Sequence, residues 1–125
     1  MKLSKNFSLS EFDCNDGSVT PKEVIVNLQL LAEQLQVLRD FVGKPITINS
    51  GYRSPSYNKK IKGALKSKHV LGQAADIRID GISAREVHGI VSELIKDGRM
   101  KIGGLGKYAN FTHVDIRETK ARWNG

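Results

Sequence analysis

Apolar residues recur every three or four positions over residues 20–43, and this spacing predicts one long amphipathic helix. Ahead of them, Thr20 and Glu23 match the N-cap and the reciprocal acid of a capping box, and Pro21 suits the first helical position. Gly43 suits the left-handed residue that ends many helices. The face expected to be buried consists of Val24, Leu28, Leu31, Leu35 and Leu38.

Farther along the chain, the pattern predicts a second helix and several short strands. Ser83 and Glu86 repeat the capping-box pattern, so a helix is expected from there to Gly98. Positions that are β-branched or alternate in polarity predict strands over residues 46–49, 75–79 and 111–117. Residues 50–65 are expected to form a loop, and the glycine-rich residues 102–108 a bulged strand or a tight loop. This order predicts a small α+β domain in which helices pack on a mainly antiparallel sheet.

The composition indicates one soluble globular domain over residues 1–125. Of the 125 residues, 39% are hydrophobic and 26% are charged, and no repeat, low-complexity tract or linker divides them. Cys14 is the lone cysteine, so no disulfide framework is expected. Nothing in the pattern indicates an obligate interface, and we expect a monomer.

The chain is basic, with 20 Lys and Arg against 13 Asp and Glu and a net charge of +7. This charge would concentrate anionic partners such as nucleic acid, anionic lipid or an acidic cell-wall polymer, and it does not choose among them. The sequence has no run of about 18 apolar residues, so no membrane span is expected. The N-terminal sequence MKLSKNFSLSEF lacks the apolar stretch of a secretory signal, and we expect synthesis in the cytoplasm.

Two histidines and one aspartate are candidate metal ligands. His69 precedes Asp76 by one short segment, and His113 lies on the last predicted strand. Two imidazoles and one carboxylate supply the three protein ligands of a catalytic zinc site. The same spacing also fits a surface histidine, a solvated aspartate and a half-buried histidine. Small residues that let backbone segments approach closely favour the site, and three of them lie between His69 and Asp76: Gly72, Ala74 and Ala75.

Two polar residues near these candidates add to the pattern. Arg53 lies on a turn that Gly51 permits, just beyond the strand predicted over residues 46–49, and loops delivered by rigid elements often carry functional groups. An ordinary surface salt bridge is the alternative role for Arg53. Ser67 lies two residues before His69, and we expect its side chain to orient the imidazole ring.

Three motifs, taken in their order along the chain, resemble one known family. They are SGYRS at residues 50–54, S-x-H-x-x-G-x-A-x-D at residues 67–76, and His113 followed by Val114 and Asp115. Together they resemble the M15 family of zinc D-Ala-D-Ala carboxypeptidases and endolysin-type peptidases, in its compact carboxypeptidase-like branch from bacteria and phages. Hedgehog signalling domains share this zinc-site architecture more distantly. The resemblance spans residues 7–117.

The resemblance implies a fold, a cofactor and a set of roles. The fold would be hedgehog-like or DD-peptidase-like, and Zn²⁺ would be held by His69, Asp76 and His113. Arg53 would meet a carbonyl oxygen or carboxylate of the substrate, a role that suits a rigid and permanently charged guanidinium. The implied reaction is metal-assisted hydrolysis of peptidoglycan stem or cross-link peptides, by a carboxypeptidase or an endopeptidase. Such an enzyme would reach the cell wall after release, as a phage lysin does, or by export.

The general base is the part of the family pattern that the sequence lacks. Related enzymes carry a Glu or His just before the second zinc histidine, where residues 109–112 are Ala, Asn, Phe and Thr. Strand periodicity places Asp115 on the same face as His113, so Asp115 is either the base or an acceptor that orients the ring. The missing base leaves an alternative function, a zinc-containing module that binds the cell wall without cutting it.

Other prominent side chains have ordinary roles as well as functional ones. His88 is expected to flank the packed face of the second helix, and Trp123 to cover the end of the core. The lysines between residues 59 and 68 form a solvated loop or attract an anionic cell-wall glycopolymer. No specific nucleic-acid partner is expected, because that role would rest on charge alone. The tyrosines either line a peptide groove or pack in the interior: Tyr52, Tyr57 and Tyr108.

Overall fold

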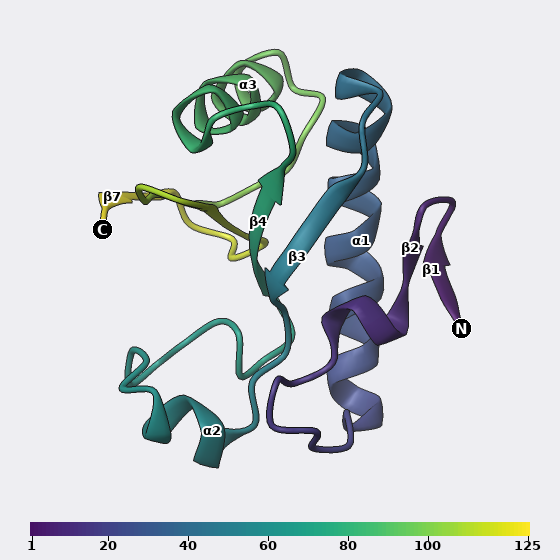
Figure 1. Ribbon diagram of the computed structural model, residues 1–125, viewed down its shortest axis with the longest axis vertical. Helices are drawn as coiled ribbons and strands as arrows, with labels where there is room; N and C mark the ends of the chain where they lie inside the picture. The colour runs from purple at the N-terminus through teal and green to yellow at the C-terminus, as the bar shows by residue number, and fades with distance from the viewer.

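A five-stranded sheet is the central element of the computed structural model, which describes all 125 residues (Figure 1). The strands are β3 (Ile46–Ser50), β4 (Ala74–Ile79), β5 (Gly104–Lys107), β6 (Thr112–Asp115) and β7 (Ala121–Asn124). Their order across the sheet is β3-β4-β6-β5-β7. β5 and β7 run parallel and the other neighbouring pairs are antiparallel, which confirms the predicted α+β domain with a mainly antiparallel sheet.

Helices and a small N-terminal hairpin surround this sheet. The helices are α1 (Lys22–Val42), α2 (Pro55–Lys60) and α3 (Ala84–Lys96), and the hairpin of β1 (Lys2–Ser4) and β2 (Phe7–Ser8) leads into a 3-10 turn, η1 (Leu9–Phe12). Figure 1 shows α1 alongside β3, with the hairpin on the other side of the helix. α3 contacts β4, β5 and β6, and α2 follows directly after β3. None of the helices combines the length and hydrophobicity that a membrane crossing requires.

One face of the sheet builds the hydrophobic core. Side chains alternate between the two faces of a strand, so every second residue of β4 points into the core. Every apolar position predicted for the buried face of α1 is buried, which confirms the amphipathic helix. Burying each such side chain contributes about 1.5–3 kcal/mol. The buried sheet residues of this core are Ile46, Ala75, Ile77, Ile79, Leu105 and Val114. The alternate positions of the same strands are left for the outer face.

The two predicted capping boxes have different outcomes. The box at Ser83 is confirmed, because its Oγ accepts from the Glu86 N–H at 3.1 Å and Glu86 Oε1 accepts from the Ser83 N–H at 3.3 Å. The box at Thr20 is wrong. Pro21 has an extended ψ of 151° and takes the N-cap position itself, its carbonyl accepting the first helical hydrogen bonds. Thr20 Oγ1 is instead buried without a hydrogen-bond partner.

Several regular elements were not predicted: the N-terminal hairpin of β1 and β2 with the turn η1, the short helix α2, and the last strand β7. α2 lies inside the expected loop of residues 50–65, where the Ser54 hydroxyl caps its first turn at 3.2 Å and Pro55 takes the first helical position. β7 lies in the tail, where Trp123 pairs with Gly106 of β5. Trp123 is not among the residues of the core or those packed against it, so the expectation that it covers the end of the core is wrong. The glycine-rich residues 102–108 contain the strand β5, which pairs with β6 and β7 without a register shift, so a strand forms there in place of a tight loop and without the expected bulge.

Gly72 lies in the segment between His69 and Asp76 and makes a close backbone contact with α1. Its φ is +73°, and a Cβ there would lie 2.5 Å from Val24 Cγ1 and 2.9 Å from the Val24 carbonyl oxygen. Gly98, just beyond α3, has a similar φ of +75° with open space around it. The two glycines therefore share the left-handed backbone and differ in packing.

We expect Gly72→Ala to lower the free energy of unfolding more than Gly98→Ala. Alanine in the left-handed region costs about 1–2 kcal/mol at either position. At Gly72 the overpacking against α1 adds about 1–3 kcal/mol. Urea denaturation of both variants measures the difference, and equal losses would contradict a tight contact between this segment and α1.

Candidate metal centre

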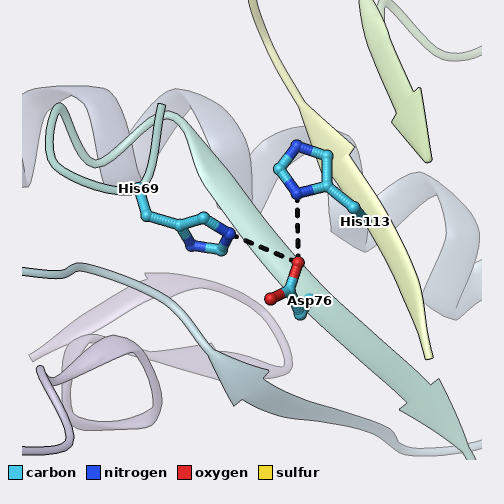
Figure 2. Close-up of side chains that lie close together, drawn as sticks. All are labelled: His69, Asp76 and His113. Carbon is cyan, nitrogen blue, oxygen red and sulfur yellow. Dashed lines mark hydrogen bonds and ion pairs between the residues drawn. The ribbon is translucent and has the colours of Figure 1, made fainter. Parts of the chain in front are cut away.

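The structure brings the three predicted metal ligands together on the outer face of the sheet. The donor atoms of His69, Asp76 and His113 all lie within 4.8 Å of one another, and all three residues are buried. Asp76 Oδ1 lies 3.3 Å from His69 Nε2 and 3.0 Å from His113 Nδ1. Figure 2 marks both contacts with dashed lines. One carboxylate oxygen therefore faces one nitrogen of each ring.

Strand register positions two of these residues, and a turn positions the third. Asp76 on β4 and His113 on β6 are direct partners in the antiparallel ladder, so their side chains share the outer face. His69 lies in the turn that precedes β4. Its Nδ1 donates to the Gly51 carbonyl oxygen at 2.8 Å, so Nε2 is the ring nitrogen that faces Asp76. The expected role of Ser67 is wrong, because its Oγ accepts from the His69 backbone N–H and does not contact the ring.

Asp115 holds the other side of the His113 ring. Its Oδ2 lies 2.8 Å from His113 Nε2, and its side chain is 0% exposed. Arg117 donates to both oxygens of this carboxylate, with Nε at 2.8 Å from Oδ1 and Nη2 at 2.7 Å from Oδ2. An ionised carboxylate can only accept, so His113 Nε2 carries a proton and donates it to Asp115, while Nδ1 is the nitrogen that faces Asp76. Metal-binding histidines are commonly held in this way by an outer carboxylate.

The buried carboxylates stay ionised because their partners outweigh the effect of burial. Burial acts to raise the pKa of Asp76, but hydrogen bonds from His113 and His69 hold that pKa well below its usual value. Burial likewise opposes ionisation of Asp115, and hydrogen bonds from His113 and Arg117 lower its pKa. For His113, burial acts to lower the pKa of the ring, and the hydrogen bonds to Asp115 and Asp76 produce a net increase. The centre thus combines two oriented imidazoles with an ionised carboxylate, a donor set that fits catalytic zinc.

Arg53 joins this centre from the turn after β3. Its Nη2 lies 3.2 Å from Asp76 Oδ2, so the two oxygens of that carboxylate have different partners. The guanidinium also donates to Ser50 Oγ at 3.2 Å and Asn58 Oδ1 at 3.4 Å, and its side chain is only 14% exposed. Arg53 therefore takes part in a largely buried network and not in an ordinary surface salt bridge.

A cavity of roughly 550 Å³ opens onto these residues. Part of its lining comes from the loop between α2 and His69, which contributes Lys62, Lys66 and Lys68. Residues 41–75 hold seven cationic residues and no acidic one, which equals the net charge of +7 of the whole chain. The excess positive charge is thus concentrated in the segment that borders the cavity.

Aromatic side chains from the strand region line another part of the cavity. Tyr108 and Phe111 stack with ring centroids 4.4 Å apart, and Trp123 Nε1 donates to the Tyr108 hydroxyl oxygen at 2.9 Å. Of the three tyrosines considered for a groove, Tyr108 lines this cavity. Tyr52 is part of the core and Tyr57 packs against it.

His88 does not belong to the metal centre. It is half-buried on α3, as expected for a residue that flanks the packed face. Burial and the nearby cations Lys107 and Arg122 lower the pKa of its ring. Two residues that the sequence did not assign to the centre take part in it: Arg117, which binds Asp115, and Trp123, whose ring lies beside His113.

The comparisons with known proteins agree with this geometry. Residues 5–115 match the family model described as Peptidase M15, so the chain belongs to the peptidase M15 family. This confirms the resemblance drawn from the three motifs. The chain is 37% identical to the zinc D-Ala-D-Ala carboxypeptidase of Streptomyces albus G over 78 residues, which are 58% of this chain and 31% of that protein.

A second relative is the peptidoglycan L,D-endopeptidase MepK of Escherichia coli K12. It is 35% identical over 94 residues, which are 68% of this chain and 48% of MepK. This chain therefore spans less than half the length of these two curated relatives.

The ligand assignment predicts how metal content responds to single substitutions. We expect the His113→Ala variant to lose the metal, because it removes one of three ligands. The His88→Ala variant serves as a matched control, since it removes a histidine outside the centre, and it should retain the wild-type metal content. Elemental analysis of the purified proteins after dialysis measures both. Equal metal content in wild type and His113→Ala would contradict the assignment.

Proposed function

We propose that this domain is a zinc-dependent peptidase that hydrolyses the stem or cross-link peptides of peptidoglycan. The observation that carries the proposal is the buried group of His69, Asp76 and His113 opening onto a cavity in a chain of the peptidase M15 family. The two relatives, a zinc D-Ala-D-Ala carboxypeptidase and a peptidoglycan L,D-endopeptidase, support the metal and the substrate class.

The three ligands would hold zinc at the cavity, where the ion supplies Lewis-acid activation of the scissile carbonyl and of water. Asp76 would bind the metal through Oδ1, while its Oδ2 keeps the ion pair with Arg53. The Arg53 guanidinium lines the cavity and keeps its charge, so it is placed to bind a carbonyl oxygen or carboxylate of the peptide.

The environment of Asp115 supports an orienting role for this carboxylate. It is fully buried, both of its oxygens are bound by His113 and Arg117, and it does not line the cavity. A general base must come within hydrogen-bond reach of the proton that it takes. Of the two roles that the sequence left open, the geometry therefore favours the acceptor that orients His113 over the base.

A second function is favoured by one feature of the cavity. Asp76 is the one acidic residue in its lining, so no second carboxylate is placed there to accept a proton. A zinc-containing module that binds peptidoglycan peptides without cutting them would have this arrangement. Such a module would bind the peptides but not hydrolyse them, and a digestion experiment distinguishes it from the peptidase.

We expect the wild-type protein to release peptide fragments from purified peptidoglycan, detected by mass spectrometry. The His113→Ala variant should release none, and His88→Ala should match wild type. Loss of a single terminal residue would identify a carboxypeptidase, and separation of longer peptides an endopeptidase. Binding of muropeptides by wild type with no cleavage would refute the peptidase and support the binding module.

We also propose that the enzyme acts as a monomer on the wall, after release from a lysed cell in the manner of a phage lysin or after export. One chain by itself brings His69, Asp76 and His113 together, so the centre needs no ligand from a second copy, which supports the monomer. Peptidoglycan lies outside the cytoplasmic membrane, so the proposed substrate requires release or export.

The lysines of the cavity are expected to attract anionic peptides that carry free carboxylates. Replacing Lys62, Lys66 and Lys68 together with glutamine should raise KM for a carboxylate-bearing stem peptide about 3- to 10-fold at low salt, with little change in kcat. The difference from wild type should shrink as salt is added. A control variant with glutamine at the exposed Lys2, Lys101 and Lys120 removes equal charge elsewhere. If both triple variants behave alike, the cavity lysines have no specific role.

A further inference from the structure

Asp76 and His113 belong to a row of residues that crosses the outer face of four strands. Asp76 on β4 is the partner of His113 on β6, His113 is the partner of Gly106 on β5, and Gly106 is the partner of Trp123 on β7. Trp123 therefore lies on the same line as two of the metal ligands, two strands away from His113.

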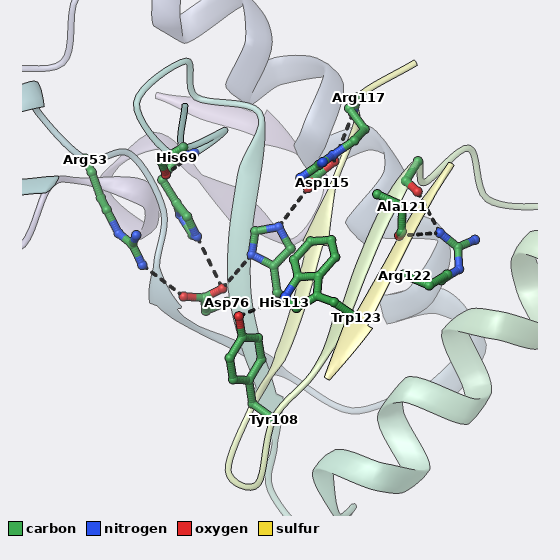
Figure 3. A network of polar contacts seen from close by, with 12 residues as sticks. Arg53, His69, Asp76, Tyr108, His113, Asp115, Arg117, Ala121, Arg122 and Trp123 are labelled. Atoms are coloured by element: carbon green, nitrogen blue, oxygen red, sulfur yellow. Dashed lines mark hydrogen bonds and ion pairs between the residues drawn. The ribbon is translucent and has the colours of Figure 1, made fainter. Parts of the chain in front are cut away.

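The glycine in this row lets Trp123 reach His113. A Cβ at Gly106 would lie 2.6 Å from Cε2 and Nε1 of the Trp123 indole, so only glycine leaves room for the ring to lie over β5. The indole then meets the His113 imidazole, with the ring centroids 4.9 Å apart and the planes at 53°. Figure 3 shows the two rings side by side next to Asp76.

A second glycine makes room for the carboxylate that binds His113. Gly104 is the strand partner of Asp115, and a Cβ there would lie 2.1 Å from Asp115 Oδ2. The Arg117 guanidinium that binds this carboxylate also lies over the Trp123 ring, 5.2 Å from its centroid. Arg117, Asp115 and Trp123 thus enclose the side of the His113 ring that faces away from Asp76.

Trp123 is itself fixed in place. Its indole N–H donates to the Tyr108 hydroxyl oxygen at 2.9 Å, and Tyr108 is stacked on Phe111. The parallel pairing of β5 with β7 fixes the Trp123 backbone. A large ring held by a hydrogen bond, a cation and a strand ladder is a rigid support for the imidazole beside it.

We propose that Arg117 and Trp123 are positioning residues of the metal centre, which hold the His113 ring with Nδ1 directed at the ion. The proposal rests on the proposed metal-binding function. Arg117 acts through Asp115, and Trp123 acts by direct contact with the ring. Both residues follow residue 115, where the match to the family model ends. The segment after residue 115, which includes β7, therefore contributes to the centre.

Removing Arg117 leaves the buried Asp115 carboxylate with the imidazole as its one remaining side-chain partner, free to reorient together with that ring. Loss of an outer partner of a metal ligand typically weakens metal binding 10- to 100-fold. Arg117→Gln removes the charge and the two parallel hydrogen bonds, and Arg117→Lys keeps the charge but not the fork. Trp123→Leu removes the ring and its N–H while keeping an apolar side chain.

The first experiment measures the zinc affinity of the metal-free full chain by competition with a chromophoric chelator. We expect Arg117→Gln to bind zinc about 10- to 100-fold more weakly, and Arg117→Lys and Trp123→Leu about tenfold more weakly. The control is Arg122→Gln, whose exposed side chain on the same strand hydrogen-bonds the Gly103 and Ala121 carbonyls and not the centre. It should bind zinc like wild type, which separates positioning from a general effect of weakening β7.

A second measurement uses the wild-type protein and does not depend on whether the Arg117 variants fold. Trp123 is the one tryptophan of the chain, so its fluorescence reports on the contact with His113. Zinc added to the metal-free wild type should change the emission, and the change should be absent in His113→Ala. Emission that does not respond although zinc binds would overturn the role of Trp123.

Two further outcomes separate this proposal from the proposed function. Variants of Arg117 and Trp123 that keep the wild-type circular dichroism and the wild-type zinc affinity would overturn the positioning role, while zinc binding and cleavage by wild type would still support the peptidase. Failure of the wild type itself to bind zinc would overturn both.

Discussion

The Asp76 carboxylate is the charge on which the outer face of the sheet depends. It is buried beside two imidazoles and a guanidinium, and burial without these partners would favour its neutral form. Its two oxygens have different partners: Oδ1 faces His69 and His113, and Oδ2 faces Arg53. Each of these partners is in turn held from behind, His69 by the Gly51 carbonyl and His113 by Asp115. The geometry of the centre is thus set by a charged hydrogen-bond network.

One face of the sheet packs in the hydrophobic core, and the other carries the metal centre. Alternation along β4, β5 and β6 sends apolar side chains to the helices on one face and leaves the ligands, and the glycines that give them room, on the other. The inner face therefore supplies most of the hydrophobic stabilisation. The outer face can carry buried charges because rigid strands, whose register is fixed by the core, hold each charge against its partner. Gly104 and Gly106 of β5 contribute to the outer face, because they leave room for the side chains of Asp115 and Trp123.

The sequence was most informative where local patterns act alone. Helical periodicity predicted the buried face of α1, and strand periodicity placed Asp115 on the same face as His113. The three ligands followed from residue types and from the family resemblance. α2 was missed because a six-residue helix has too few positions for a period to show. The contact of Trp123 with His113 depends on the parallel pairing of β5 with β7, which brings together residues that no local pattern relates.

The distribution of charge along the chain has a consequence for how the molecule meets a surface. Outside residues 41–75 the cationic and acidic side chains are equal in number, so the excess positive charge lies in this one segment. In the field of a polyanionic surface such a molecule experiences a torque, which turns its positive segment toward the surface. Lysines of that segment border the cavity, so the molecule would land with its opening toward the polymer. The molecule would then be oriented before it touches the polymer, and a larger fraction of its collisions with the polymer would bring the cavity into contact.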